Sequence, residues 1–202
     1  MKKLAAVCII GLVLGTAGVF AEDQKSDGGG SGIFTKDQHP DGWGIGIQGG
    51  FGMGGGGAAL SLKIPALPIF WAVRLNFGGS SREGHESHFG IGVSGDYYFI
   101  DKAILPDIGL GWYLGAGAYI GYWNNTWHGW GGNDDWSYSL LQIGVEVPVG
   151  LSWMIPIPVK LELYLQAVPN IGAQFAVAGS DYYDDGAFWF SIGGNLGIRI
   201  WF

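Results

Sequence analysis

The segment SLLQIGVEVPVGLSW, residues 139–153, alternates between two kinds of side chain along almost its whole length. The odd-numbered positions from Leu141 to Trp153 are all apolar, whereas the even-numbered positions between them carry polar or small residues such as Gln142 and Glu146. Because successive side chains of a β-strand point to opposite faces, this pattern predicts a strand with one apolar face and one polar or small face.

The same period of two continues from Trp43 to the C-terminus. Leu161 and Leu163, for example, alternate with Lys160 and Glu162. This alternation predicts eight strands, at residues 43–53, 58–64, 68–78, 88–99, 107–123, 137–153, 158–178 and 187–202.

The connections between these strands alternate in kind. Some are short and marked by proline, such as IPALP (64–68) and MIPIP (154–158). Others are polar, aromatic and acidic, such as NNTWHGWGGNDD (124–135) and AGSDYYDD (178–185). Short turns at one end and longer loops at the other end are typical of a barrel that crosses a membrane.

The composition favours a barrel surrounded by lipid over one surrounded by water. Only 13% of the 202 residues are charged, whereas a soluble surface carries about 25–35%. The apolar face of the strands is bulky, and the opposite face is rich in glycine and other small residues, which suit the narrow interior of an eight-stranded barrel. The prediction is therefore an all-β fold, a closed antiparallel up-and-down transmembrane β-barrel of about eight strands.

The N-terminal residues indicate export. Lys2 and Lys3 precede an apolar stretch that ends in small residues at Ala21, which predicts a signal peptide over residues 1–21. Residues 22–41 are polar, aperiodic and rich in Gly and Ser, and they predict a flexible periplasmic lead-in before a barrel over residues 42–202. Cleavage would remove Cys8, the only cysteine, and make the net charge more negative than −7, which excludes nucleic acid as a partner.

The last strand resembles that of the small eight-stranded bacterial outer-membrane proteins, which end in phenylalanine preceded by apolar residues at every second position. The matching residues are Leu196, Ile198, Ile200 and Phe202. The resemblance implies that the chain resides in the outer membrane, and that the barrel-assembly machinery reads this strand as an assembly signal. The opening segment, residues 42–63, is similar to the first hairpin of spirochaete-type members of the group.

The strand pattern places a set of charged side chains on the inner face of the barrel. We expect them to pair with one another and to fill the lumen, because buried charges must be paired or solvated. The alternative is a narrow polar conduit or binding cleft. The predicted lumen network consists of Lys63, Arg74, Asp96, Glu146, Lys160, Glu162 and Arg199.

The segment WNNTWHGWGGNDDW, residues 123–136, is the most suggestive surface feature. Its four tryptophans are Trp123, Trp127, Trp130 and Trp136. Rigid aromatic side chains among Gly and Asn are typical of recognition surfaces, which predicts a loop that contacts an extracellular ligand. A cluster that rests on the lipid headgroups is the equally open alternative.

The sequence contains no arrangement that predicts catalysis, a metal site or a cofactor site. His85 and His88 have no third ligand at a defined spacing, and no nucleophile, base and orienting group can be assembled on the predicted strands. The predicted function is a non-enzymatic barrel with a structural or adhesion role in the envelope. The alternative is a transport or binding barrel for small, largely apolar molecules, which the inward positions of Tyr113, Tyr119 and Trp189 favour.

Overall fold

The computed structural model describes residues 38–52, 55–65, 67–80, 85–128, 136–178 and 187–202. The predicted signal peptide lies outside these residues. The elements are β1 (Gly44–Gly52), β2 (Gly55–Lys63), β3 (Ile69–Ser80), β4 (His85–Leu105), the short 3-10 helix η1 (Pro106–Ile108), β5 (Leu110–His128), β6 (Trp136–Glu146), β7 (Val149–Ile155), β8 (Lys160–Ala178) and β9 (Ala187–Trp201). No helix within the described ranges is long and apolar enough to span a membrane.

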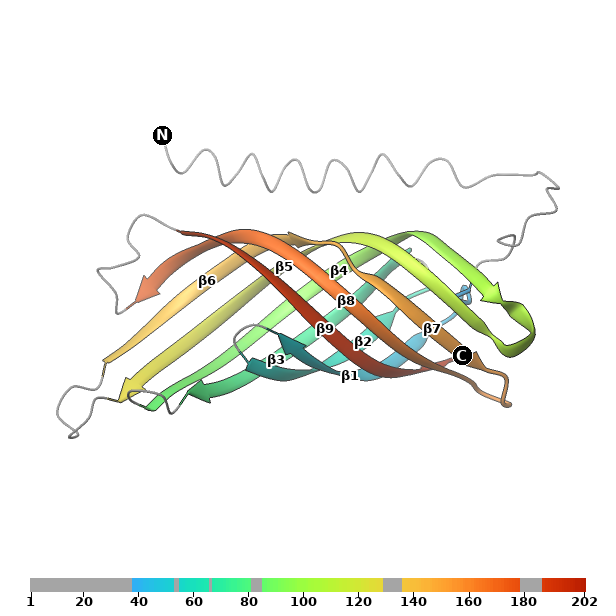
Figure 1. Ribbon diagram of the computed structural model, residues 1–202, viewed down its shortest axis with the longest axis horizontal. Coiled ribbons are helices and arrows are strands. Elements are labelled where there is room, and N and C mark those ends of the chain that lie inside the picture. Colours follow the sequence, from blue (N-terminus) through green and yellow to red (C-terminus); the bar gives the residue numbers. More distant parts are fainter. Residues whose placement is uncertain (1–37, 53–54, 66, 81–84, 129–135, 179–186) are drawn as a thin grey trace. The chain divides into compact units, whose positions relative to one another are not determined.

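The strands form one closed antiparallel ring (Figure 1). Each strand from β1 to β5 pairs with the next, β8 pairs with β9, and β9 pairs with β1 to close the ring. Both β6 and β7 lie between β5 and β8, so together they occupy one place in a ring of eight. The predicted all-β, eight-stranded closed barrel is confirmed.

The predicted strand 137–153 is interrupted at Val147 and Pro148. Proline has no backbone N–H to donate, which explains the break in the regular ladder. Two hydrogen bonds cross the break: Gly115 N–H donates to the Pro148 carbonyl at 2.8 Å, and Val147 N–H donates to the Pro169 carbonyl at 2.9 Å. The strand is therefore divided, but its backbone remains bonded to both neighbours.

The hairpin of β4 and β5 is longer than the sequence pattern indicated. Residues 101–105 belong to β4, although they were expected to form part of a short connection. The chain then reverses through η1 and Gly109, whose φ of 73° is in the left-handed region that glycine adopts without strain. At the other end β5 continues to His128, five residues beyond the predicted limit.

Burial in this barrel is the reverse of burial in a soluble protein. The buried residues include Gln48, Lys63, Glu146, Glu162 and Arg199. Bulky apolar residues are exposed on every strand except β6, and examples are Ile47, Leu60, Phe77, Ile120, Leu151, Leu165 and Leu196. An apolar exterior that surrounds a polar interior is unfavourable in water and is suited to an apolar solvent.

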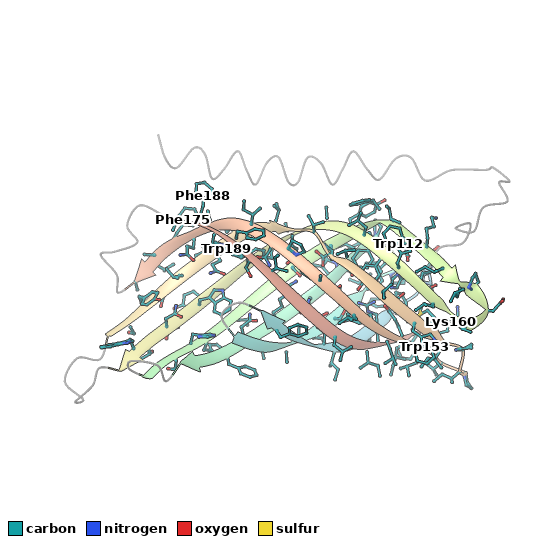
Figure 2. The ribbon with its side chains drawn as sticks, viewed as in Figure 1. Trp112, Trp153, Lys160, Phe175, Phe188 and Trp189 are labelled. Carbon is teal, nitrogen blue, oxygen red and sulfur yellow. The ribbon has the colours of Figure 1, made fainter. Side chains whose placement is uncertain are left out.

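The two ends of the barrel differ, and we name them by their connections. The short-turn end contains the turns after β2, β4 and β7 and the C-terminal residue Phe202. The loop end contains the connections between β1 and β2, β3 and β4, β5 and β6, and β8 and β9. In Figure 2, Trp153 and Lys160 lie toward the short-turn end, and Phe188 and Trp189 lie toward the loop end.

Candidate functional site

The structure places most of the predicted lumen network inside the barrel. Lys63, Asp96, Glu146, Glu162 and Arg199 are buried, and Arg74 is partly buried. Lys160 is an exception, because it is exposed at the first residue of β8. The alternation assigned it to the correct side of the strand, but a long side chain at the rim of a barrel reaches solvent.

Glu162 is the centre of a buried polar cluster at the short-turn end. Its side chain is 0% exposed, and its Oε2 atom accepts hydrogen bonds from Arg199 Nη1 at 2.7 Å and from Trp201 Nε1 at 2.8 Å. Arg199 also donates from Nη2 to Ser61 Oγ at 2.8 Å. The charge of Glu162 is therefore compensated by a cation and by additional donors, as a buried carboxylate requires.

His39 completes this cluster, and the sequence analysis did not identify it. Its ring nitrogens contact two carboxylates: Nδ1 lies 2.8 Å from Asp101 Oδ1, and Nε2 lies 2.8 Å from Glu162 Oε1. The neighbouring Gln38 donates from Nε2 to the Gly109 carbonyl at 2.6 Å. The prediction of a flexible lead-in up to residue 41 is therefore wrong for Gln38 and His39, which pack into the barrel end.

The two contacts of His39 require a positively charged ring. A neutral imidazole donates from one nitrogen only, whereas both nitrogens here face carboxylate oxygens. Burial alone would lower the pKa of His39, which precedes the first strand. The carboxylates of Glu162 and Asp101 outweigh this effect and raise the pKa from 6.5 to about 9. The ring is thus an imidazolium at neutral pH.

The raised pKa of His39 predicts that the barrel loses stability in alkaline solution. The stabilising contribution is fully present below the ordinary pKa of 6.5 and is lost as the pH rises through about 9. The shift corresponds to about 3 kcal/mol. Urea unfolding of the wild type and of His39→Asn, each in detergent micelles, should show a stability difference that shrinks by about this amount between pH 6.5 and pH 9.5. A difference that does not change with pH would contradict the charged state of His39.

Aromatic side chains fill the space around these charges. Tyr98 stacks on Phe70 with ring centroids 4.1 Å apart and on Tyr113 at 4.4 Å. The Arg199 guanidinium lies 4.9 Å from the centroid of Phe70, at cation–π distance. His39, Phe70, Tyr98, Tyr113, Glu162 and Arg199 together form what we call the short-turn plug.

Glycines make room for rings in this part of the lumen. A side chain at Gly150 would collide with the ring of Tyr113, and one at Gly197 would collide with the ring of Tyr164. The hydroxyl groups of these tyrosines reach glutamine side chains: Tyr113 donates to Gln166 Oε1 at 2.8 Å, and Tyr164 donates to Gln48 Oε1 at 2.7 Å. The small residues of the inner face are therefore the surfaces on which the lumen aromatics pack.

A second charge pair lies in the lumen beyond the plug. Arg74 donates from Nη1 and Nη2 to the two carboxylate oxygens of Glu146, at 3.0 and 2.7 Å. Asp96 lies beside this pair. Lys63 does not join it, because its ammonium donates to the carbonyls of Ile64 and Leu67 in its own turn, at 3.0 and 2.8 Å. The expected network is thus two separate clusters and one lysine that stabilises a turn.

A cavity of about 650 Å³ occupies the loop-end half of the lumen. Amide side chains from five strands line it: Asn76, Asn125, Gln142, Asn170, Gln174 and Asn195. The lumen is therefore filled at one end and hollow at the other.

The four predicted loop tryptophans do not share one location. Trp123 and Trp127 belong to β5, because its pairing with β6 continues to Trp127 and Trp136. Trp123 lines the cavity, so its assignment to a surface loop is wrong. Trp136 is the first residue of β6, and Trp130 lies outside the described residues.

The predicted assembly strand is β9. Its residues Leu196, Ile198 and Ile200 are exposed on the outer face. Phe202 follows the strand with 72% of its surface exposed, and its N–H donates to the Trp43 carbonyl at 2.8 Å. This hydrogen bond joins the C-terminal residue to the residue that precedes β1.

No protein-family model matches the chain, and no curated protein sequence matches it. Three solved structures are similar. A major outer membrane protein from Thermus thermophilus is 13% identical, with a TM-score of 0.43, over 80% of this chain and 98% of that one. The N-terminal β-barrel domain of Pseudomonas aeruginosa OprF is 15% identical, with a TM-score of 0.40, over 80% and 98%. Neisserial surface protein A (NspA) is 17% identical, with a TM-score of 0.41, over 79% and 94%. None of the three comes from a spirochaete, so they give no support to the spirochaete-type resemblance.

Proposed function

We propose that this chain is a non-enzymatic barrel of the bacterial outer membrane that does not conduct solutes. It would serve envelope structure or recognition at the cell surface. The apolar exterior supports insertion into a bilayer, because a closed ring satisfies the backbone hydrogen bonds that lipid cannot satisfy. The predicted export signal and the resemblance of the last strand support the outer membrane as its location.

The short-turn plug is the observation that carries this proposal. His39 joins Asp101 on β4 to Glu162 on β8, which are not neighbouring strands. The stacked rings and the Arg199 guanidinium fill the space around this connection. A solute that passed through the barrel would have to break paired buried charges, and breaking such pairs is strongly unfavourable.

Conductance tests the plugged lumen directly. The purified protein in planar lipid bilayers should show no current steps, and liposomes that contain it should take up neither polar nor apolar solutes faster than empty liposomes. Uptake of a small apolar solute would favour the alternative function, a transport barrel. Ion currents through the wild-type protein would contradict a lumen closed by the short-turn plug.

The loop end is the surface that a recognition role would use. Under the proposed orientation this end faces outward, because the longer connections of membrane barrels are extracellular. Trp127 and Trp136 lie opposite each other on β5 and β6, next to the connection between these strands. They would support a ligand-binding loop or an aromatic cluster at the headgroups, as the sequence predicts.

The C-terminal residue provides a test of the proposed assembly partner. Deletion of Phe202 should reduce the amount of barrel inserted in the outer membrane of a bacterial host by a large factor. It should change refolding of the purified chain in detergent much less, since β9 keeps its pairing with β1 and β8. Cell fractionation measures the amount of inserted barrel. The faster gel migration of the unboiled barrel measures refolding in detergent. Equal insertion of both proteins would contradict an assembly signal at Phe202.

A further inference from the structure

The cavity in the loop-end half of the lumen has the size of a ligand site. Its volume of about 650 Å³ lies within the range of roughly 300–1,000 Å³ that small-molecule sites occupy. Residues from β3, β4, β5, β6, β8 and β9 line it, so the rigid strands of the barrel hold its shape. A site built on strands is more precisely fixed than one built on loops.

Amide side chains supply polar groups on the cavity wall. Those of Asn76, Asn125 and Asn195 line it, from β3, β5 and β9. Each amide carries two N–H donors and one carbonyl acceptor. The set therefore contains both donors and acceptors, so its complement is a ligand that carries both, such as a polyhydroxylated molecule.

The charged groups around the cavity favour a neutral ligand over an anion or a cation. Arg74 is the one Lys, Arg, Asp or Glu side chain among the described residues that line it. Its two terminal nitrogens are already occupied by Glu146, at 3.0 and 2.7 Å. A phosphate or carboxylate would therefore compete with a bidentate pair, and a cation would find no carboxylate among the described residues of the wall.

Aromatic rings lie beside these polar atoms. Tyr119 and Trp189 meet edge to face with centroids 5.3 Å apart, and Trp123 lies next to His88 at 5.7 Å. A sugar ring has the matching character, because its C–H groups form apolar patches and its hydroxyl groups donate and accept at the edge. Convergent polar groups on an aromatic wall are typical of specific small-molecule sites.

Glycines keep this part of the lumen open. A Cβ atom at Gly121 would meet no atom closer than 3.5 Å, so a larger side chain there extends into the cavity without a backbone collision. Gly49, on the outer face of β1, has no atom within 4 Å of such a Cβ. These two glycines provide a matched pair of substitutions, one that fills the cavity and one that leaves it unchanged.

We infer that the cavity binds a neutral mono- or disaccharide, held by the amide groups of Asn76, Asn125 and Asn195 and by contact with the aromatic rings. The ligand would remain in the loop-end half, because the short-turn plug closes the other half. This activity goes beyond the structural and recognition role proposed above.

Tryptophan fluorescence and equilibrium dialysis of the full chain test the inference, in micelles of a detergent without a sugar headgroup. Glucose, maltose and trehalose are the probes, and cyclohexanol is the apolar comparison. At least one sugar should bind saturably, with a dissociation constant on the order of 1 mM. Gly121→Leu should weaken binding at least tenfold, whereas Gly49→Leu should leave it unchanged.

A second variant keeps the size of the side chain. Asn195→Leu removes only the polar atoms of the amide, and it should weaken binding about tenfold, as the loss of one hydrogen bond does. Faster gel migration before boiling shows that each variant has folded. The inference is overturned if no sugar binds at a concentration about ten times the expected dissociation constant. It is also overturned if cyclohexanol binds more tightly than every sugar, or if Gly121→Leu binds sugar as tightly as the wild type does. Because these measurements use micelles, ion currents in bilayers would contradict the proposed function without affecting this result.

Discussion

Replacement of Arg199 by methionine is expected to lower the free energy of unfolding of the barrel by about 3–5 kcal/mol. The guanidinium lies 2.7 Å from the carboxylate of Glu162, which is 0% exposed. Methionine has a similar length but no charge, so Glu162 would remain buried with less compensation. The loss of one partner of a buried ion pair is costly because the other charge stays desolvated. Urea unfolding in lipid vesicles, followed by tryptophan fluorescence, measures the effect.

Lys160→Met is the matched control for this experiment. It removes a cation from β8 two residues before Glu162, but Lys160 is exposed. Exposed substitutions usually change stability by less than about 0.5 kcal/mol. Equal losses in the two variants would show that burial of the Glu162 pair does not determine stability at this end of the barrel.

Replacement of Leu165 by arginine is expected to lower the free energy of unfolding from vesicles by about 2–4 kcal/mol. Leu165 is 51% exposed on the outer face, opposite Leu151 and Leu196 on the neighbouring strands. All three side chains would contact acyl chains if the barrel spans a bilayer. A charge in the hydrocarbon core of the bilayer has neither water nor a counter-charge to stabilise it.

Val177→Arg on the same face of the same strand is the matched control. Val177 is 59% exposed, but it lies one residue from the loop end of β8. Near the interface the same charge costs only about 0–1 kcal/mol. If the two variants lost equal stability, the positions of Leu165 and Val177 would not be at different depths of a membrane, and the proposed insertion of the barrel across the bilayer would be wrong.

The fold could be predicted from the sequence because a strand has a fixed period of two. Alternation over 139–153 and 158–178 assigned each side chain to a face without knowledge of its neighbours, and the buried positions of Glu146 and Glu162 follow from that assignment. The ends of the strands were less predictable. Alternation also continues through Trp123, but the polar composition of the segment favoured a loop over the strand extension that the structure has.

The contacts within the lumen could not be predicted in the same way. A period of two states that Glu162 and Arg199 point inward, but it does not state which inward residue each one meets. His39 carried no signal at all, because it lies in an aperiodic polar segment and its two partners are 62 and 123 residues away. The cavity depends on which side chains leave space in three dimensions, which the one-dimensional pattern does not contain.

The bridge through His39 also has a consequence for kinetics. Its partners lie on β4 and β8, which are not neighbours in the ring, so we expect the bridge to form late in assembly, once the ring of strands has closed. Contacts that are absent from the transition state slow unfolding without accelerating folding. We therefore expect the His39 contacts to slow unfolding of the closed barrel and to leave the rate of its formation unchanged.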